Sequence, residues 1–302
     1  MSQKPHHSGV VAIIGPPNAG KSTLLNHLLQ QKIAIVTPRP QTTRNRIMGI
    51  VTGENHQMIL LDTPGLHEAH EEMNRRMVRV AMESLNEADV VLFLVDCTDM
   101  ASQRLERRAE EFRGYLAGLE TPVVLALNKM DLLSPDRLLP VMDWYQHLHP
   151  FAAQVPISAL QGKGVDVLTA ELVARLPEGP QYYPDDIPTD ATERFIASEI
   201  IREKIFLLTR DEVPYSTAVI IDAFEEGEPG KPVVIKATIL VERASQKGIL
   251  IGQGGAMLAA IRTSAVADLQ RLLDCRVRLN LWVKVSKNWT GKINLLKELG
   301  LG

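Results

Sequence analysis

Short apolar runs alternate with amphipathic stretches through the first half of the chain. The apolar runs are rich in β-branched residues, a pattern typical of strands that are buried on both faces. We expect strands at 10–14, 59–62, 90–96 and 123–127. The stretches between them repeat apolar residues at helical spacing, and we expect helices at 22–31, 72–86, 103–119, 135–148 and 165–176. This alternation predicts an α/β fold, in which helices surround a mostly parallel sheet.

The order of the elements changes in the second half. Residues 177–188 contain four prolines and a glycine, which is typical of a linker between domains. Beyond the linker we expect helix, strand, strand, short helix, long helix, strand and terminal helix at 192–208, 216–224, 233–241, 245–251, 256–273, 276–285 and 293–299. We therefore predict an α/β domain at 1–180, a linker at 181–190 and a smaller α+β domain at 191–302.

Length and composition limit the possible classes of protein. The chain has 302 residues, more than one compact core usually contains, so two domains are expected. No apolar run approaches the roughly 18 residues that a membrane-spanning helix needs. The polar first nine residues lack the apolar core of a signal peptide. Cys97 and Cys275 lie in different halves, so we expect no disulfide framework and a location in the reducing cytoplasm.

The formal net charge of −3 conceals an asymmetry along the chain. Residues 191–302 hold 16 Lys and Arg against 13 Asp and Glu, and within 236–298 the balance is 11 against 4. A basic end on an otherwise acidic protein is an expected feature of polyanion binding. Charge alone favours a solvated surface, so the pattern needs a motif before it indicates RNA.

Residues 15–22 read GPPNAGKS and fit the phosphate-binding pattern G-x-x-x-x-G-K-S. The sequence lies between an expected strand and an expected helix, so its backbone N–H groups and the helix dipole both favour bound phosphate. Lys21 is expected to neutralise the β- and γ-phosphates, and the Ser22 hydroxyl to bind Mg²⁺. The residues that we expect to contact the nucleotide here are Gly15, Pro16, Pro17, Asn18, Ala19, Gly20, Lys21, Ser22 and Thr23.

A second motif, the DTPG sequence that starts at Asp62, follows an expected strand. Asp62 is expected to hold Mg²⁺ directly or through water, and the Gly65 N–H to approach the γ-phosphate. Loss of that phosphate would release the loop that follows, as in GTPase switches. Between the two motifs, a threonine of the QTTR sequence is expected to complete the magnesium shell, with Thr43 preferred and Thr42 as the alternative.

Two further motifs, NKMD and SAL, follow apolar runs that end at residues 127 and 157. A carboxylate at Asp131 can accept hydrogen bonds from guanine N1–H and the 2-amino group, whereas adenine offers no such donor pair. Asn128 is expected to tie this loop to the phosphate loop, Lys129 to cover the base, and the Ala159 N–H to reach guanine O6. The residues that we expect to contact the base are Asn128, Lys129, Asp131, Ser158, Ala159 and Leu160.

In the second half, residues 252–255 read GQGG between two expected helices. A G-x-x-G loop in this setting clamps about four nucleotides, and the order of elements is that of a type II KH domain. KH loops commonly carry a basic residue between the glycines; none is present here, so Lys247 or Arg262 is expected to contact phosphate instead. Trp282 and Trp289 are candidates to stack on bases, although core packing is expected for Trp282 in its strand. The residues that we expect to bind RNA are Lys247, Ile251, Gly252, Gln253, Gly254, Gly255, Arg262, Lys284 and Lys287.

Taken together, these motifs resemble those of the translation-factor-related P-loop GTPases. The sequences GPPNAGKS, QTTR and DTPGL narrow the resemblance to the Era-like branch, and VER, IGQGG and LWVKV are similar to the KH domain of the Era family. The resemblance implies a magnesium-dependent GTPase whose GTP-bound form binds single-stranded RNA near the 3′ end of 16S rRNA. It also implies a role in assembly of the small (30S) ribosomal subunit. Members of this family are cytoplasmic and are sometimes found at the inner surface of the cell membrane, and we expect this chain to be a monomer.

One position departs from the Ras-like pattern of hydrolysis. A glutamine after D-x-x-G positions water in those enzymes, but Leu66 stands there, so we expect slow turnover with water oriented by backbone, Mg²⁺ or another group. Related GTPases with an asparagine at the position of Asn18 bind K⁺ beside the phosphates; alternatively, Asn18 only stabilises the loop. Arg44 and Arg46 could also reach the phosphates, but exposed arginines are common in such segments, so we assign them no role. The residues that we expect to act in hydrolysis are Lys21, Thr43, Gly65 and Asn18.

Two other functions fit part of the sequence. An RNA-binding assembly scaffold that holds GTP with negligible turnover would agree with Leu66. A GTPase of the membrane or of tRNA modification would share the phosphate-binding motif. The lack of transmembrane segments argues against a membrane transport GTPase. The KH-like second half, which lacks a cysteine-bearing catalytic segment, argues against a tRNA-modification GTPase.

Overall fold

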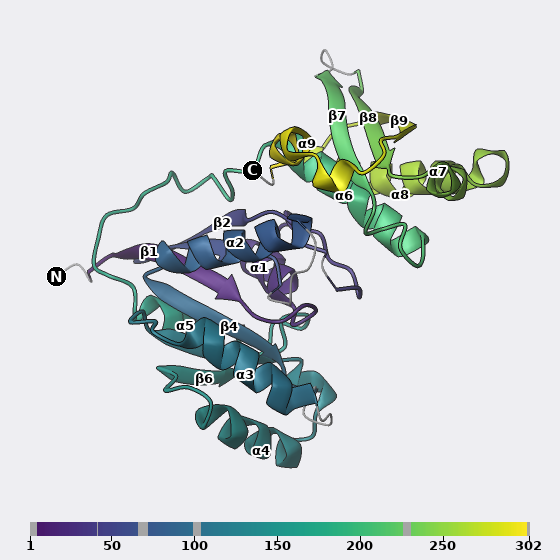
Figure 1. The fold of residues 1–302 in the computed structure, drawn as a ribbon. Helices are drawn as coiled ribbons and strands as arrows, with labels where there is room; N and C mark the ends of the chain where they lie inside the picture. Colours follow the sequence, from purple (N-terminus) through teal and green to yellow (C-terminus); the bar gives the residue numbers. More distant parts are fainter. Residues whose placement is uncertain (1–4, 41, 66–71, 99–103, 226–230, 301–302) are drawn as a thin grey trace. The chain divides into compact units, whose positions relative to one another are not determined.

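The structure is a computed structural model, and it describes residues 5–40, 42–65, 72–98, 104–225 and 231–300 (Figure 1). Internal contacts divide the chain into two units. The first unit comprises Met1–Gln31, Arg46–Glu68 and Val78–Asp190, and the second comprises Lys32–Asn45, Ala69–Met77 and Ala191–Gly302. Two short segments from the first half of the sequence therefore belong to the second unit by their contacts.

A six-stranded sheet forms the centre of the first unit, in the order β2-β3-β1-β4-β5-β6. Its strands are β1 (His7–Ile14), β2 (Ile47–Gly53), β3 (His56–Asp62), β4 (Val90–Asp96), β5 (Val123–Asn128) and β6 (Ala153–Pro156). All neighbours pair in parallel except β2, which runs antiparallel to β3. Strands β4 and β5 are buried along almost their whole length, as expected for central strands with helices on both faces. The predicted α/β fold is confirmed.

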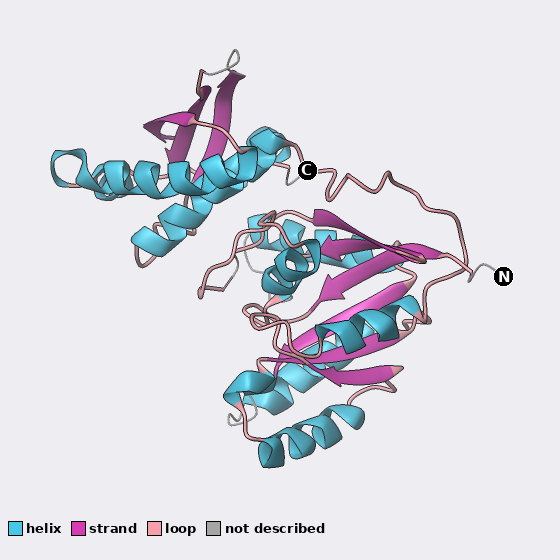
Figure 2. Ribbon diagram, turned by 180° about the vertical axis from the view of Figure 1, so that it is seen from behind, coloured by secondary structure: helices cyan, strands magenta, loops and turns pink. Residues whose placement is uncertain are grey.

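Helices lie on both faces of this sheet (Figure 2). They are α1 (Lys21–Leu29), α2 (Glu72–Asn86), α3 (Arg104–Leu116), α4 (Pro135–Gln146) and α5 (Val165–Val173). On one face, Leu85 of α2, Phe112 of α3 and Tyr145 of α4 join one apolar cluster with Phe93 of β4. The rings of Phe93 and Phe112 meet edge to face, with centroids 5.0 Å apart. Helix α1 packs on β2 and β3, and α5 packs on β1, β5 and β6.

The sequence patterns do not predict β2, the antiparallel edge strand. Gly49 in its middle weakens the β-branched pattern by which the other strands are recognised. The structure gives the reason for this glycine, because a Cβ at Gly49 would lie 2.6 Å from Leu25 Cδ1 and 2.9 Å from Leu29 Cδ1. The missing side chain therefore lets α1 pack closely on β2.

The second unit contains a three-stranded sheet in the order β7-β8-β9. Strands β7 (Ala218–Glu225) and β8 (Val233–Val241) are antiparallel, whereas β8 and β9 (Val277–Val285) are parallel. The helices are α6 (Glu193–Leu208), α7 (Ala244–Ile251), α8 (Ala256–Leu273) and α9 (Ile293–Glu298). Helix–strand–strand–helix–helix–strand is the predicted type II KH order, so this part of the fold prediction is also confirmed.

The two tryptophans of the second unit have opposite environments. Trp289 is fully buried with Leu240 and Leu296, and its Nε1 donates to the Ser216 carbonyl oxygen at 2.9 Å. The expectation of core packing for Trp282 is wrong, because this side chain is 53% exposed. In β9 the buried positions alternate with exposed ones, and Trp282 points to the face of the sheet opposite the helices.

Among the described residues, no single helix combines the length and apolar character needed to cross a bilayer. One bent pair, Ala244–Ile251 with Gln253–Leu273, meets those two criteria when its members are taken together.

Candidate functional site

The four nucleotide motifs meet at one edge of the six-stranded sheet. The phosphate loop follows β1, Asp62 ends β3, Asn128 ends β5 and Ser158 follows β6. Because these strands are parallel, their carboxyl ends share one edge, which is where open α/β sheets bind ligands. Residues separated by more than a hundred positions in the sequence are thereby brought together.

The phosphate loop depends on backbone conformations that favour glycine. Gly15 has φ +147°, and a Cβ there would lie 2.0 Å from the Leu94 carbonyl oxygen. Gly20 caps α1 with φ 101°, and the exposed Asn18 adopts φ 64°. These three residues turn the chain sharply between β1 and α1, so that the loop lies at the N-terminus of a helix, where phosphate is favoured.

Lys21 is buried and lies over its own loop. Its Nζ donates to the carbonyl oxygens of Gly15 and Pro16, both at 3.0 Å. Burial lowers the pKa of Lys21 to about 8, and the carboxylate of Asp62 partly opposes that lowering. A buried ammonium costs free energy unless an anion offsets it, so this position favours a phosphate ligand.

Asp62 and Ser22 are suited to magnesium. Asp62 is fully buried, and its Oδ2 accepts a hydrogen bond of 2.6 Å from the Ser22 hydroxyl. Its other oxygen, Oδ1, is buried and has no hydrogen-bond partner in the described part of the chain. Burial raises the pKa of Asp62 to about 6, and Lys21 and Ser22 oppose the rise. Hard oxygen donors of this kind fit Mg²⁺, which would be held by these two side chains and would offset phosphate charge.

Gly65 lies directly against the phosphate loop. A Cβ at this position would lie 2.9 Å from both the Cα and the backbone nitrogen of Pro17, closer than real Cβ contacts allow. The absence of a side chain therefore lets two nucleotide motifs touch, and the approach of the Gly65 N–H to the γ-phosphate stays a prediction.

Replacing Gly65 by alanine is expected to slow GTP hydrolysis on the order of 100-fold, because the two motifs must separate by a fraction of an ångström to 1 Å. Single-turnover phosphate release with saturating GTP measures this effect. Gly114→Ala in α3 is the matched control, since a Cβ there meets nothing within 4 Å. Equal rates for Gly65→Ala and the wild type would contradict the role of Gly65.

Asn128 connects the base-binding and phosphate-binding loops. Its Nδ2 donates to the Ala19 carbonyl oxygen at 2.7 Å, and its Oδ1 accepts from the Ala159 N–H at 2.9 Å. The side chain is buried, so both bonds are shielded from water. The bond to Ala19 agrees with the expectation that Asn128 ties its loop to the phosphate loop. The Ala159 N–H, which was expected to reach guanine O6, donates to Asn128 here, so its contact with the base stays a prediction.

The remaining base-binding candidates lie around Asn128. Lys129 has φ 65°, and its Nζ pairs with Asp96 Oδ2 at 2.5 Å. Asp131 is exposed, and its Oδ2 accepts from Gln161 Nε2 at 3.4 Å, which places it beside the SAL loop. Leu160 is 80% exposed. The candidates from these loops are buried (Gly15, Pro16, Ala19, Lys21, Asp62, Gly65, Asn128, Ser158 and Ala159), partly buried (Pro17, Gly20, Ser22, Thr23 and Lys129) or exposed (Asn18, Asp131 and Leu160).

The two candidate threonines belong to the second unit. Thr42 and Thr43 are both buried there, and the Thr42 hydroxyl lies 2.7 Å from that of Thr37. The role of Thr43 as a magnesium ligand stays a prediction. Gln41 and Leu66, which were also considered for this part of the site, lie outside the described residues.

The interpretation of Arg44 as an exposed residue is wrong. It is 5% exposed, and its guanidinium donates to three backbone carbonyls of the second unit. Arg46 behaves as interpreted, since it is partly exposed and pairs with Glu87 at 2.6 Å. The sequence carries no signal for the difference, because the partners of Arg44 are about 170 residues away.

The G-x-x-G loop joins α7 to α8 in the second unit. Gly252 has φ 73°, and a Cβ there would lie 2.8 Å from Met257, so glycine is required. Gly254 and Gly255 also have positive φ, but no atom lies within 4 Å of their Cβ positions, which leaves this side of the loop open. The side chain of Gln253 is exposed. An open, glycine-rich backbone of this kind can press against a nucleic-acid strand.

The basic RNA-binding candidates occupy two different faces. Lys247 lies on α7 and Arg262 on α8, the two helices that the loop joins, and Arg262 is exposed. Lys284 lies on β9 in the same exposed set as Trp282, on the face of the sheet turned away from the helices. Ile251 is half-buried at the end of α7, and Lys287 is exposed after β9. Lys284 therefore lies on a different element from Lys247 and Arg262, and the contact of all three with RNA stays a prediction.

Comparisons with known proteins agree with both units. Family models for a 50S ribosome-binding GTPase and for a KH domain match residues 10–129 and 212–290. The GTPase Era of Geobacter metallireducens is 50% identical over 300 residues, with 99% of each chain covered. The GTPase Era of Syntrophus aciditrophicus is 50% identical over 293 residues, covering 97% of this chain and 94% of that one.

Solved structures give the same result. A crystal structure of Era in complex with MgGDPNP and nucleotides 1506–1542 of 16S ribosomal RNA is 40% identical, with a TM-score of 0.93 over 98% of this chain and 99% of that one. A variant of Aquifex aeolicus Era bound to GDP and AlF₄⁻ is 39% identical, with a TM-score of 0.92 and the same coverage.

Proposed function

We propose, since the chain belongs to the Era family of GTPases, that its GTP-bound form binds single-stranded RNA near the 3′ end of 16S rRNA. In this proposal the bound protein assists assembly and maturation of the 30S subunit, and GTP hydrolysis ends the bound state. The observation that carries the proposal is the open G-x-x-G backbone between α7 and α8, in a chain whose first unit gathers four guanine-nucleotide motifs at one sheet edge. The Era complex with MgGDPNP and 16S rRNA supports it.

Hydrolysis in this proposal depends mainly on positioning and charge. The loop amides and the Lys21 ammonium bind the phosphates, and the Gly65 N–H approaches the γ-phosphate. Bound Mg²⁺ supplies positive charge next to the transferred phosphoryl group. Ser22 and Asp62 are the described side chains placed to hold it, and Thr43 is the proposed third. Without a glutamine after the DTPG motif, the attacking water is oriented by backbone groups or by the metal, so intrinsic turnover is slow.

We further propose that Asn18 supports a K⁺ ion beside the phosphates. The residue is exposed in the phosphate loop and has a left-handed backbone conformation. GTP hydrolysis is expected to be several-fold faster in K⁺ than in Na⁺ of equal ionic strength, and Asn18→Ala is expected to remove the difference. Equal rates in the two salts, with a silent Asn18→Ala, would exclude this role.

The proposed function is tested by RNA binding in two nucleotide states. The full chain, bound to a non-hydrolysable GTP analogue or to GDP, is titrated into a labelled single-stranded RNA from the 3′ end of 16S rRNA at fixed salt, because phosphate contacts are salt-sensitive. Tighter binding of the GTP form is expected. A scrambled RNA of equal length is the control. Equal, weak binding of both RNAs in both states would leave the GTPase without an RNA target.

The other functions are less favoured. Membership of a GTPase family argues against a scaffold with negligible turnover. The KH domain in the second unit argues against an enzyme of tRNA modification. A cytoplasmic location, a monomeric state and peripheral contact with the inner surface of the membrane remain parts of the proposal.

A further inference from the structure

The segment that leads from α1 to β2 is attached to the elements of the second unit. It spans Lys32–Asn45 and contains Thr43, the proposed magnesium ligand. Every contact described below lies within the second unit. Gln41, one residue of this segment, lies outside the described residues.

Arg44 anchors the carboxyl end of the segment. Its Nη1 donates to the Thr217 carbonyl oxygen at 2.6 Å, and its Nη2 donates to those of Tyr215 at 2.7 Å and Pro214 at 3.3 Å. The guanidinium carbon lies 5.9 Å from the ring centroid of Trp289, within the range of a cation–π contact. One side chain of the segment thus binds the loop before β7 and the buried centre of the second unit.

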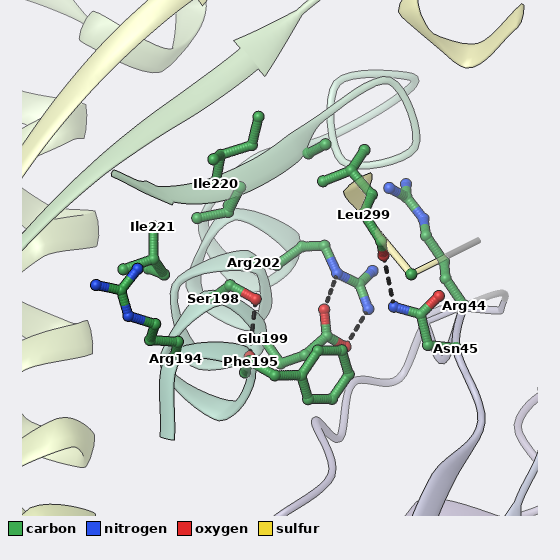
Figure 3. Close-up of a pocket in the computed structure, with 13 residues that line it drawn as sticks. Arg44, Asn45, Arg194, Phe195, Ser198, Glu199, Arg202, Ile220, Ile221 and Leu299 are labelled. Carbon is green, nitrogen blue, oxygen red and sulfur yellow. Dashed lines mark hydrogen bonds and ion pairs between the residues drawn. The ribbon is translucent and has the colours of Figure 1, made fainter. Parts of the chain in front are cut away.

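Arg202 of α6 holds the residue on the other side of Thr43. The Nη2 of Arg202 donates to the Thr42 carbonyl oxygen at 2.5 Å. Glu199 accepts from the Nε of Arg202 at 2.7 Å and from its Nη2 at 2.6 Å (Figure 3). Arg202 is 3% exposed, so these charge-assisted bonds are shielded from solvent. Thr42 and Arg44 flank Thr43, and therefore the backbone on both sides of Thr43 is fixed to the second unit.

The amino end of the segment is attached by a separate charge network. Lys32 Nζ pairs with Glu203 Oε1 at 2.7 Å and with Asp268 Oδ2 at 2.8 Å. The Val36 N–H donates to the other oxygen of Glu203 at 3.2 Å. Glu203 lies on α6 and Asp268 on α8, so the segment is bonded to two helices of the KH fold.

The packing around these anchors is incomplete. A cavity of about 350 Å³ borders Asn45, Arg202 and β7. Arg202 Nη1 and Asn45 Oδ1 are both buried without a hydrogen-bond partner among the described residues. Unpaired buried polar groups destabilise the arrangement that contains them, so they lower the free-energy cost of releasing the segment.

We propose that Arg44 and Arg202 are positioning residues that fix Thr43 to the second unit and so transmit the nucleotide state to RNA binding. Ligation of Mg²⁺ requires an oxygen at about 2.1 Å in defined geometry, so engagement of Thr43 places a constraint on the backbone that carries it. With both flanking residues anchored, that constraint acts on α6 and on the loop before β7. The result is a free-energy coupling between GTP and RNA, of the kind that changes affinity by about 5- to 150-fold. This inference rests on the proposed function.

The test compares RNA affinities of the full chain with a GTP analogue and with GDP, using the 16S 3′-end RNA. The main variant is Glu199→Gln/Arg202→Met, which removes both members of the buried pair and so leaves neither charge unpaired. A second variant, Lys32→Met, breaks the separate attachment at the amino end and leaves Glu203 and Asp268 paired with Lys204. The measured quantity is the RNA dissociation constant in the GDP state divided by that in the GTP-analogue state. This ratio is expected to fall to within about 2-fold of one in the double variant and to fall by a smaller amount in Lys32→Met. GTP binding and RNA affinity in the GDP state are expected to be unchanged.

Arg194→Met is the matched control. Arg194 lies two turns before Arg202 on α6 and borders the same cavity, but it is exposed and makes no hydrogen bond to the described residues of the segment. Its ratio is expected to equal that of the wild type. If both variants keep the same ratio as the wild type, this inference alone is overturned. If the wild-type protein itself has a ratio of one, the nucleotide dependence of the proposed function is overturned, and this inference with it.

Discussion

Replacement of Lys21 by alanine is expected to abolish measurable GTP binding at micromolar protein concentration, and hydrolysis with it. The ammonium is held within the phosphate loop by two carbonyls, at the position where phosphate charge must be neutralised. Hydrogen bonds to charged groups contribute about 1.5–3 kcal/mol each, so loss of contacts to two phosphates weakens binding by roughly 100-fold or more. Titration with a fluorescent GTP analogue measures the change.

The fold is expected to survive this substitution. Burial lowers the pKa of Lys21 to about 8, which means that the protein interior disfavours the charged form. Removal of the ammonium therefore has no large stability cost, and thermal unfolding checks this point. Lys297→Ala, at an exposed site in α9, is the control for loss of a lysine. A fully active Lys21→Ala protein would remove Lys21 from the phosphate site.

Replacement of Asp131 by asparagine is expected to exchange guanine for xanthine specificity. A carboxylate accepts from both guanine N1–H and the 2-amino group, whereas an amide can donate to the second carbonyl of xanthine. Sites that pair a polar substrate group reject an analogue without it by large factors, so GTP affinity is expected to fall by roughly three orders of magnitude and xanthosine triphosphate affinity to rise. Competition between the two nucleotides on one protein sample gives both values.

Asp136→Asn provides the matched control for this exchange. Asp136 is an exposed aspartate in the first turn of α4, close in sequence to Asp131 but outside the NKMD motif. Its substitution is expected to leave the preference for guanine intact. If Asp131→Asn also retained that preference, Asp131 would not contact the base, and Lys129 or the SAL loop would have to account for specificity.

The central strands and most helices are predictable from the sequence because their patterns are local. The runs that form β4 and β5 are continuous and β-branched, and the helices of the second unit begin and end within a few residues of the expected positions. Strand β2 escapes prediction because its Gly49 is selected by contact with α1 and not by strand propensity. Trp282 escapes for a similar reason, since the face of a strand that helices cover is decided by the whole unit.

Some contacts between the nucleotide-binding motifs can be predicted from the sequence, because the motifs themselves specify the residues that make them. The bond of Asn128 to the Ala19 carbonyl is an example, whereas its bond to the Ala159 N–H was not predicted. The environment of Arg44 is different. Its partners are backbone carbonyls in a loop far along the chain. Every residue has a backbone carbonyl, so the residue types in that loop do not indicate this contact. Contacts of that kind become visible only when the fold is known.

The distribution of tryptophan gives the protein three optical reporters of different kinds. Trp144 packs edge to face on Tyr145 in the first unit, Trp289 is buried beside Arg44, and Trp282 is open to solvent on β9. Their emission should therefore divide into a blue-shifted component that resists acrylamide quenching and a red-shifted component that yields to it. The chain has no other tryptophan, so single replacements by phenylalanine assign each component to its residue. The environments of Trp144 on α4, Trp289 in the core of the second unit and Trp282 on β9 can then be followed separately in unlabelled protein.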